Sequence, residues 1–231
     1  MFDRSESLRP AAFMDIAQEL AAVGSEQLHF ADADLKPHGL VWILARMDTH
    51  YDALPRRGDS VTVQTWHKGL DGIFLIREYR MLGPDGRTAV RSTSSWIIMD
   101  LETRRAVRAD RLGGIIDLEP QADDVAVERA CPKIVLPAGA VPAHVADHRV
   151  SYSDVDYNGH ANNARYSVWA MDCLPGDIAY SQRIKEIAIN FNREACPGET
   201  VALHHCAEGN VHFVEGRTEN RQIFICRLIF D

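Results

Sequence analysis

The order of predicted elements repeats within the chain of 231 residues, and this repeat constrains the fold more than any other feature. Residues 10–28 carry apolar side chains at the i, i+3, i+4 and i+7 spacing of an amphipathic helix. Segments with strand character follow the predicted helix at residues 40–48, 60–67, 73–82 and 88–100. The stretch Gly83-Pro84-Asp85-Gly86 predicts a hairpin turn between the last two.

The same order returns near residue 148. A short extended segment over 148–153 precedes a second predicted helix, whose buried face would carry Tyr166, Trp169, Ala170 and Cys173. Strand-like segments then follow at residues 183–191, 200–207, 211–215 and 222–230. The letters repeat as well, because Gly58-Asp59-Ser60-Val61-Thr62-Val63 matches Gly198-Glu199-Thr200-Val201-Ala202-Leu203, 140 positions later. A helix followed by antiparallel strands, twice in one chain, predicts an α+β protein built from two copies of one module.

The interval between the two copies shows neither helix nor strand periodicity. Residues 109–147 mix Gly, Pro, Ala and acidic side chains, a composition typical of a linker. We therefore predict an N-terminal module over 1–125, a linker over 126–147 and a C-terminal module over 148–231.

The charge balance narrows the classes of partner. Lys and Arg total 25 against 33 Asp and Glu, so the net charge is −8 and a nucleic-acid partner is not expected. An acidic protein could still meet the local basic run at 104–111, although such a run is usually a solvated loop.

Other features concern the compartment and cofactors. No apolar run approaches the roughly 20 residues that span a bilayer, so we predict no membrane partner. Residues 1–10 contain no signal-peptide core. The five cysteines lack disulfide or metal spacing, which indicates free thiols in a reducing cytoplasm. His204, His205 and His212 lie in strand-like segments whose alternation separates the neighbouring pair, so no metal is predicted, and the absence of a phosphate loop predicts no nucleotide cofactor.

Polar residues are concentrated just before the second helix, in VSYSDVDYNGHANNARY. In an extended segment Asp156, Asn158 and His160 would project from one face. We expect Gly159 to permit a turn, and the N–H groups of Gly159, Ala161 and Asn162 to stabilise an oxyanion at the helix N-terminus. These groups suit acyl transfer to water. An Asx turn with a helix cap is the structural alternative, but the first helix begins near Pro10 without such side chains.

The same motif resembles the active-site segment of acyl-acyl carrier protein thioesterases, which hydrolyse fatty acyl chains from their carrier protein. In that family Asp-X-Asn-X-His is followed by a small residue, Asn-Asn, and then Tyr and Trp. The resemblance extends over nearly the whole chain through Gly39-Leu40-Val41-Trp42, Pro55, Gly58-Asp59, Thr65-Trp66, Arg77-Glu78-Tyr79 and Ser94-Ser95-Trp96, which follow the family's order.

The resemblance implies a double hotdog fold, in which an antiparallel sheet wraps each long helix. It places the catalytic acid, amide and imidazole on Asp156, Asn158 and His160, and a Glu of the family's aromatic-Arg-Arg-Glu-Cys pattern on Glu194. Ala195 stands where the family has Cys, and Cys196 is displaced by one residue. Because such a slip reverses side-chain direction in an extended chain, a nucleophilic role for Cys196 is disfavoured. The short N-terminus also leaves little room for the strand that precedes the first helix in that family.

The motif suits hydrolysis, and the resemblance implies a hydrolase of fatty acid biosynthesis and lipid metabolism; we expect it to form no covalent acyl-enzyme. Asp156 or Glu194 would deprotonate a water, while Asn158 and His160 orient it. The expected partner is acyl carrier protein bearing a fatty acyl chain, and the chain would act as a monomer or homodimer. Leu54 matches Glu194 in the first half, which therefore looks catalytically empty and suited to an acyl pocket. Alternatives are an acyl-CoA thioesterase, a hotdog hydratase or dehydratase, and a non-catalytic acyl-binding module.

Overall fold

The computed structural model describes residues 1–29, 31–108, 111–112, 119–219 and 221–231. The first half contains α1 (Pro10–Gln27), α2 (Asp32–Leu35), a 3-10 turn η1 (Lys36–His38), β1 (Leu40–Tyr51), β2 (Thr62–Asp71), β3 (Phe74–Leu82) and β4 (Thr88–Asp100). The second half contains β5 (Ala143–Arg149), α3 (Asn163–Asp172), α4 (Gly176–Ser181), β6 (Ile184–Phe191), β7 (Thr200–Glu208), β8 (Val211–Thr218) and β9 (Arg221–Phe230). Residues 109–110 and 113–118, which belong to the predicted linker interval and the end of the basic run, lie outside the described part.

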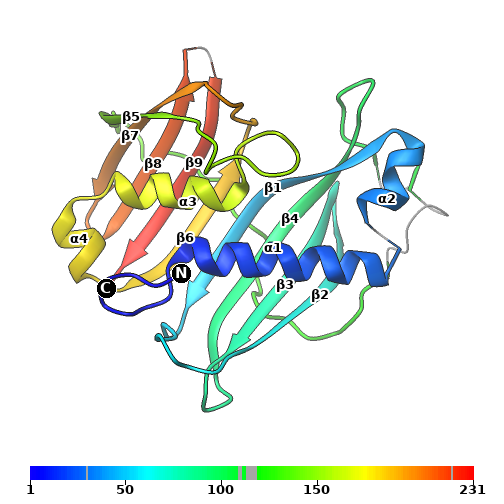
Figure 1. Cartoon of the computed structure of the whole chain (residues 1–231), viewed down its shortest axis with the longest axis horizontal. Helices are drawn as coiled ribbons and strands as arrows, with labels where there is room; N and C mark the ends of the chain where they lie inside the picture. Colours follow the sequence, from blue (N-terminus) through cyan, green and yellow to red (C-terminus); the bar gives the residue numbers. More distant parts are fainter. Residues whose placement is uncertain (30, 109–110, 113–118, 220) are drawn as a thin grey trace.

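The strands form one antiparallel sheet in the order β2-β3-β4-β1-β6-β9-β8-β7-β5 (Figure 1). The halves join where Arg46–His50 of β1 pair with Glu186–Asn190 of β6. On either side of this seam the strands are arranged alike, since β4, β3 and β2 follow β1 as β9, β8 and β7 follow β6. The glycines of the repeated hexapeptides, Gly58 and Gly198, precede β2 and β7 with φ of +93° and +82°, a conformation that favours glycine.

The two longer helices lie on one face of the sheet and pack against each other (Figure 1). α1 buries Phe13 and Ala17 against the sheet, as its apolar spacing predicts, and it also buries Met14. α3 likewise buries Tyr166 and Trp169, whose rings meet edge to face with centroids 4.9 Å apart. These side chains share one continuous core that spans both halves. The site described below is therefore built on a rigid layer of helix and sheet.

Most predicted elements are confirmed, with small shifts at their ends. The strand over 88–100 has the predicted bounds, the first helix ends one residue early at Gln27, and a turn at 83–86 joins β3 and β4. The predicted strand 211–215 continues to Thr218.

The region around residue 147 differs from the prediction. β5 occupies 143–149, which the prediction divided between the linker and an extended segment over 148–153. Nearly every β5 residue is exposed, so the segment lacks the apolar alternation from which a strand is predicted. Its strand conformation is instead stabilised by pairing with β7.

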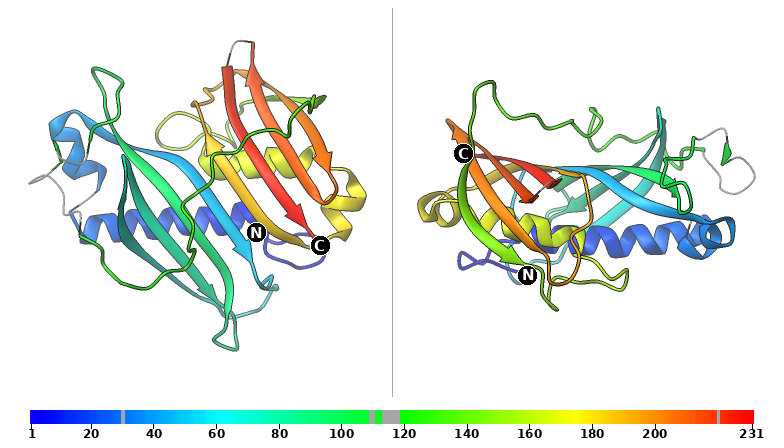
Figure 2. Two further views of the ribbon diagram at one scale, coloured as in Figure 1. Left: turned by 180° about the vertical axis from the view of Figure 1, so that it is seen from behind. Right: turned by 90° about the horizontal axis from the view of Figure 1, so that it is seen from above.

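The segment 119–136, here called the strap, crosses the face of the sheet opposite the helices (Figure 2). Glu78, fully buried on β3, accepts hydrogen bonds from Lys68 Nζ at 2.6 Å and from the Ala126 N–H. In the second half, the Asn190 side chain accepts from the Ile134 N–H at 2.8 Å and donates to the Pro132 carbonyl at 2.9 Å. Much of the predicted linker is thus fastened to both halves of the sheet.

The two ends of the sheet differ. No strand precedes α1 in the described N-terminal residues, which form isolated bridges such as Ser7 with Arg56. β2 therefore forms one edge, whereas β5 covers β7 at the other. None of the helices in the described residues is long and apolar enough to cross a membrane.

Candidate active site

The loop from β5 to α3 folds back on itself. Val155 forms a bridge with Ala161, and the Asp156 N–H donates to the His160 carbonyl at 3.1 Å. An Asx turn closes the tip, where the Asn158 N–H donates to Asp156 Oδ1 at 2.9 Å, and Gly159 has φ of +84°. The prediction that Asp156, Asn158 and His160 line one face of an extended segment is therefore wrong. Asp156 and His160 lie half-buried at the base of the loop, and Asn158 is exposed at its tip.

The loop lies against the turn that follows β6. The Ala161 N–H donates to the Ala195 carbonyl at 2.8 Å, and the Ala195 N–H donates to the hydroxyl of buried Tyr166 at 3.2 Å. This contact brings His160 Nε2 to 3.9 Å from Glu194 Oε1. Two side chains that the sequence separates by 34 positions (194 − 160) thus form an ion pair whenever the imidazole is protonated.

The predicted oxyanion donors are already engaged. The N–H groups of Gly159, Ala161 and Asn162 donate to the carbonyls of Asp156, Ala195 and Asp154 at 2.8–3.0 Å. The prediction that they are unpaired is wrong, because the folded loop uses these groups to satisfy its own backbone. The Asn158 side chain has no hydrogen-bond partner among the described residues.

Asn162 begins α3 as its N-cap. Its Oδ1 accepts from the Ala164 N–H at 2.8 Å, while its Nδ2 lies 3.4 Å from Asp156 Oδ2. Gln18 of α1 donates to the same Oδ1 at 3.3 Å. The first half therefore reaches the site through Gln18, a residue that the sequence presents as an ordinary polar position of an amphipathic helix.

Asp154 also lies beside the site, and sequence reasoning missed it. It is 6% exposed and accepts hydrogen bonds from His148 Nε2 and the Ser151 N–H at 2.9 and 2.8 Å, and from Trp169 Nε1 at 3.3 Å. Burial alone would raise the pKa of Asp154, but the hydrogen bonds from Ser151 and His148 outweigh it and the pKa is lowered. Asp154 is thereby held as a carboxylate that anchors the start of the loop. Its position two residues before Asp156 was the feature of the sequence that could have revealed it.

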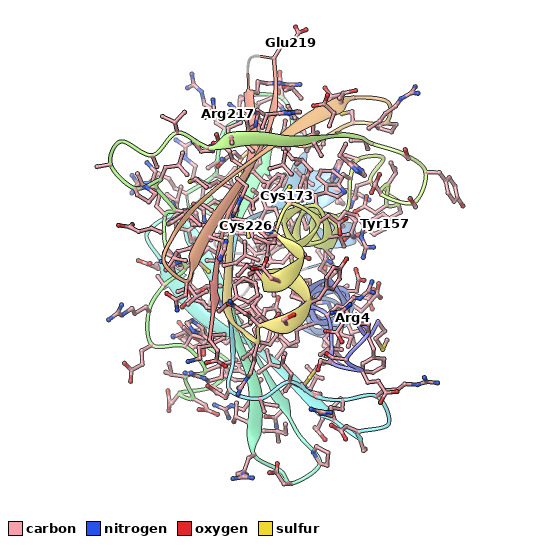
Figure 3. The ribbon with its side chains drawn as sticks, turned by 90° about the vertical axis from the view of Figure 1, so that its left-hand side faces the viewer. Arg4, Tyr157, Cys173, Arg217, Glu219 and Cys226 are labelled. Atoms are coloured by element: carbon pink, nitrogen blue, oxygen red, sulfur yellow. The ribbon has the colours of Figure 1, made fainter. Side chains whose placement is uncertain are left out.

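The cysteines are free, and only Cys196 is fully exposed. Ala195 beside it is completely buried, so the two side chains face different environments, as expected for neighbouring residues of an extended chain. Burial raises the pKa of the Cys173 thiol to about 11 and that of Cys226 well above its usual value. Figure 3 shows Cys173 and Cys226 in the interior and Tyr157 projecting outwards from the loop.

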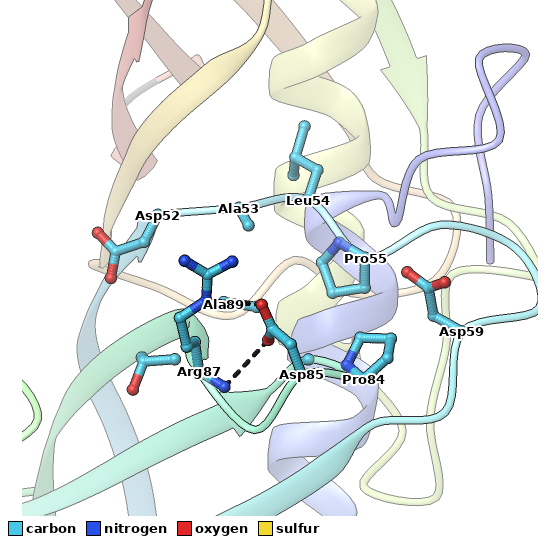
Figure 4. Close-up of a pocket in the computed structure, with 11 residues that line it drawn as sticks. Asp52, Ala53, Leu54, Pro55, Asp59, Pro84, Asp85, Arg87 and Ala89 are labelled. Carbon is cyan, nitrogen blue, oxygen red and sulfur yellow. Dashed lines mark hydrogen bonds and ion pairs between the residues drawn. The ribbon is translucent and has the colours of Figure 1, made fainter.

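The matching turn of the first half has different chemistry. Residues 52–55 follow β1 as 192–195 follow β6, and Leu54 takes the place of Glu194 (Figure 4). A cavity of about 540 Å³ adjoins this turn, lined by Asp52, Ala53, Leu54, Pro55, Asp59, Gly83, Pro84, Asp85, Arg87, Thr88 and Ala89. This lining contains no imidazole, and its Arg87 is paired with Asp85 at 2.6 Å.

Comparisons with known proteins agree on one family. A model of the acyl-ACP thioesterase N-terminal domain matches residues 1–111, and a model of its C-terminal domain matches residues 142–227. The chain is 29% identical over 194 residues to the palmitoyl-acyl carrier protein thioesterase of Arabidopsis thaliana, covering 74% of this chain and 43% of that protein. It is 27% identical over 172 residues to oleoyl-acyl carrier protein thioesterase 1 of the same plant, covering 70% and 47%. The chain thus spans less than half the length of these chloroplastic relatives.

Solved structures share the fold. An acyl-ACP thioesterase from Bacteroides thetaiotaomicron superposes with a TM-score of 0.89 at 21% identity, covering 99% of this chain and 92% of that one. The 12:0-ACP thioesterase from Umbellularia californica gives 0.84 at 19% identity, covering 100% and 92%. The architecture is accordingly the hotdog-like one of these proteins. With both domain models matched in order along most of the chain, the protein belongs to the acyl-ACP thioesterase family.

Proposed function

We propose that the protein hydrolyses the thioester of fatty acyl-acyl carrier protein, releasing a fatty acid and the free carrier. The observation that carries this proposal is the meeting of His160 and Glu194 beside Asp156, at the position where the family motif lies. An imidazole and two carboxylates at the surface of a rigid core are suited to activating water. The reaction belongs to fatty acid biosynthesis.

The hydrogen bonds favour Glu194 as the general base. Asp156 accepts one hydrogen bond on each carboxylate oxygen, from the Asn158 N–H and from Asn162 Nδ2, so both of its oxygens are already engaged. The Glu194 side chain is 42% exposed, and among the described residues its ion-pair partner is His160. Glu194 is therefore open to a water, while Asp156 and His160 orient the neighbouring groups.

The chemical step is a direct attack of water on the thioester carbonyl. Glu194 takes a proton as the water oxygen bonds to the carbonyl carbon, and the carbon–sulfur bond then breaks. The proton passes to the departing thiolate, so Glu194 returns to its starting state. Since the loop N–H groups are occupied, we assign oxyanion stabilisation to the exposed amide of Asn158.

The proposal extends to the organisation of the chain. We propose two tandem hotdog modules, over residues 1–125 and 148–231, joined by residues 126–147. The equivalent strand orders around the β1–β6 seam support this division. The first module would be catalytically empty and supply the acyl pocket. The partner would be acyl carrier protein rather than nucleic acid or a membrane, with the protein a monomer or homodimer. The free cysteines fit a reducing compartment such as the cytoplasm.

The test measures thiol release from a chain-length series of acyl carrier protein and CoA thioesters. Wild type should hydrolyse the carrier-protein thioesters, and Glu194→Gln and Asp156→Ala should each lower kcat by about 100-fold or more. Cys196→Ala is the matched control and should retain full activity. Equal rates with CoA thioesters would instead favour an acyl-CoA thioesterase. If wild type releases thiol from none of them, the proposed function is refuted.

A further inference from the structure

The Asn162 side chain serves two groups at once. Its Oδ1 accepts from the Ala164 N–H at 2.8 Å, as the helix N-cap requires an oxygen at this position. The amide is planar, so its Nδ2 must then face away from the helix. In that direction lies Asp156 Oδ2, at 3.4 Å. Capping α3 therefore determines which end of the amide meets the carboxylate.

Gln18 of α1 reinforces this orientation. Its Nε2 donates to Asn162 Oδ1 at 3.3 Å and to the Met14 carbonyl at 3.2 Å. A flipped Asn162 amide would present its own N–H groups to two donors, from Ala164 and from Gln18. An ion pair between Asp15 of α1 and Arg165 of α3, at 2.7 Å, also holds the two helices side by side. Arg165 lies one helical turn after Asn162.

We propose that Asn162 and Gln18 are positioning residues that hold Asp156 as an oriented carboxylate, so that the first half contributes to the reaction of the second. This inference rests on the proposed function. Gln18 and Asn162 are 144 positions apart, and their contact depends on the packing of α1 against α3. The titratable and charged groups facing this region are His160 on the same loop, Glu194 and Cys196 after β6, Arg165 and Tyr166 on α3, and Asp15 on α1.

Variants of Asn162 separate capping from positioning. Ser is a good N-cap, so Asn162→Ser should unfold at nearly the wild-type temperature, whereas Asn162→Ala should unfold at a lower one. Asn162→Ser removes the donor to Asp156, and we expect kcat to fall about tenfold with little change in KM. Asn162→Asp replaces that donor with a second carboxylate facing Asp156, so kcat should fall by more than in Asn162→Ser, again with little change in KM.

Gln18→Met provides an independent test from the other half of the molecule. It should reduce kcat about threefold with little change in KM, because Asn162 loses one of the two donors that orient it. Gln27→Met, at the exposed end of the same helix, is the matched control and should behave as wild type. Unchanged kcat values in Asn162→Ser, Asn162→Asp and Gln18→Met would overturn the inference.

A measurement that needs no turnover distinguishes this failure from that of the proposed function. The chemical shift of the Asp156 carboxyl carbon, followed by NMR on the whole labelled chain at one fixed pH, should differ from wild type in Asn162→Ser but not in Gln27→Met. An unchanged chemical shift in Asn162→Ser refutes the positioning role. Absence of thiol release by wild type, with the chemical shift still changed in Asn162→Ser, refutes only the proposed thioester hydrolysis.

Discussion

The ion pair beneath the strap offers a sharp test of how the chain is held together. Lys68→Met removes the cation that faces Glu78, whose carboxylate has no exposed surface. The Ala126 N–H would then be its sole remaining donor among the described residues. Breaking a buried pair in this way typically costs about 3–5 kcal/mol, because an uncompensated charge is left in the interior.

The expected magnitude lies at the lower end of that range. The Lys68 side chain is 26% exposed, so water partly screens the pair. A loss of about 3 kcal/mol corresponds to a fall in melting temperature of roughly 6–12 °C for a chain of this size. Glu78→Gln should cost less, about 1–2 kcal/mol, because its amide oxygen still accepts from Ala126 and Lys68 can be hydrated. Adding Glu78→Gln to Lys68→Met should recover much of the lost stability.

Calorimetry and urea unfolding measure these changes, and limited proteolysis within residues 119–136 reports whether the strap detaches first. Asp124→Asn is the matched control. Asp124 lies on the same strap and forms an exposed ion pair with Arg80 of β3, so this variant should cost under about 1 kcal/mol. If Lys68→Met destabilises the protein no more than Asp124→Asn, the reasoning from burial is refuted.

Two further predictions concern the sheet. The hydrogen bond with Asp48 raises the pKa of His50, against the opposing effect of burial. The contribution of His50 to stability should therefore be complete below about pH 6.5 and should be lost as the pH rises through the pKa of His50 in the folded protein. Unfolding free energies of wild type and His50→Gln should accordingly differ more at pH 6 than at pH 8.5, and a difference independent of pH would contradict this. A Cβ at Gly216 would lie 2.3 Å from the Phe224 ring, so Gly216→Ala should cost about 2–3 kcal/mol by overpacking. Gly176→Ala is the control, because a Cβ there would lie 3.6 Å from its nearest neighbour, the Tyr180 ring. Equal melting temperatures for the two variants would contradict the prediction, since they would mean that the core accommodates a methyl group at Gly216.

Local patterns predicted most of the elements. The α1 stripe around Phe13 and Ala17 and the bounds of β4 follow from apolar spacing, because that spacing records which way each side chain points along a single element. The resemblance identified the motif residues, and His160 and Glu194 do meet. The same reasoning failed for β5, whose exposed residues carry no such pattern, and for the loop at 155–161, whose conformation depends on an Asx turn and on pairing with Ala195.

The sequence by itself therefore determined the order of most helices and strands and the residue types available for chemistry, since each of these is encoded within a short window. The tertiary structure decided which groups are free to react. In the folded protein the N–H groups of Gly159, Ala161 and Asn162 are hydrogen-bonded to backbone carbonyls, whereas the Asn158 side chain is exposed. The tertiary structure also brought Gln18 to Asn162 across 144 positions. Hydrogen-bond satisfaction and helix packing depend on what surrounds a residue in space, and neighbours along the chain do not specify those surroundings.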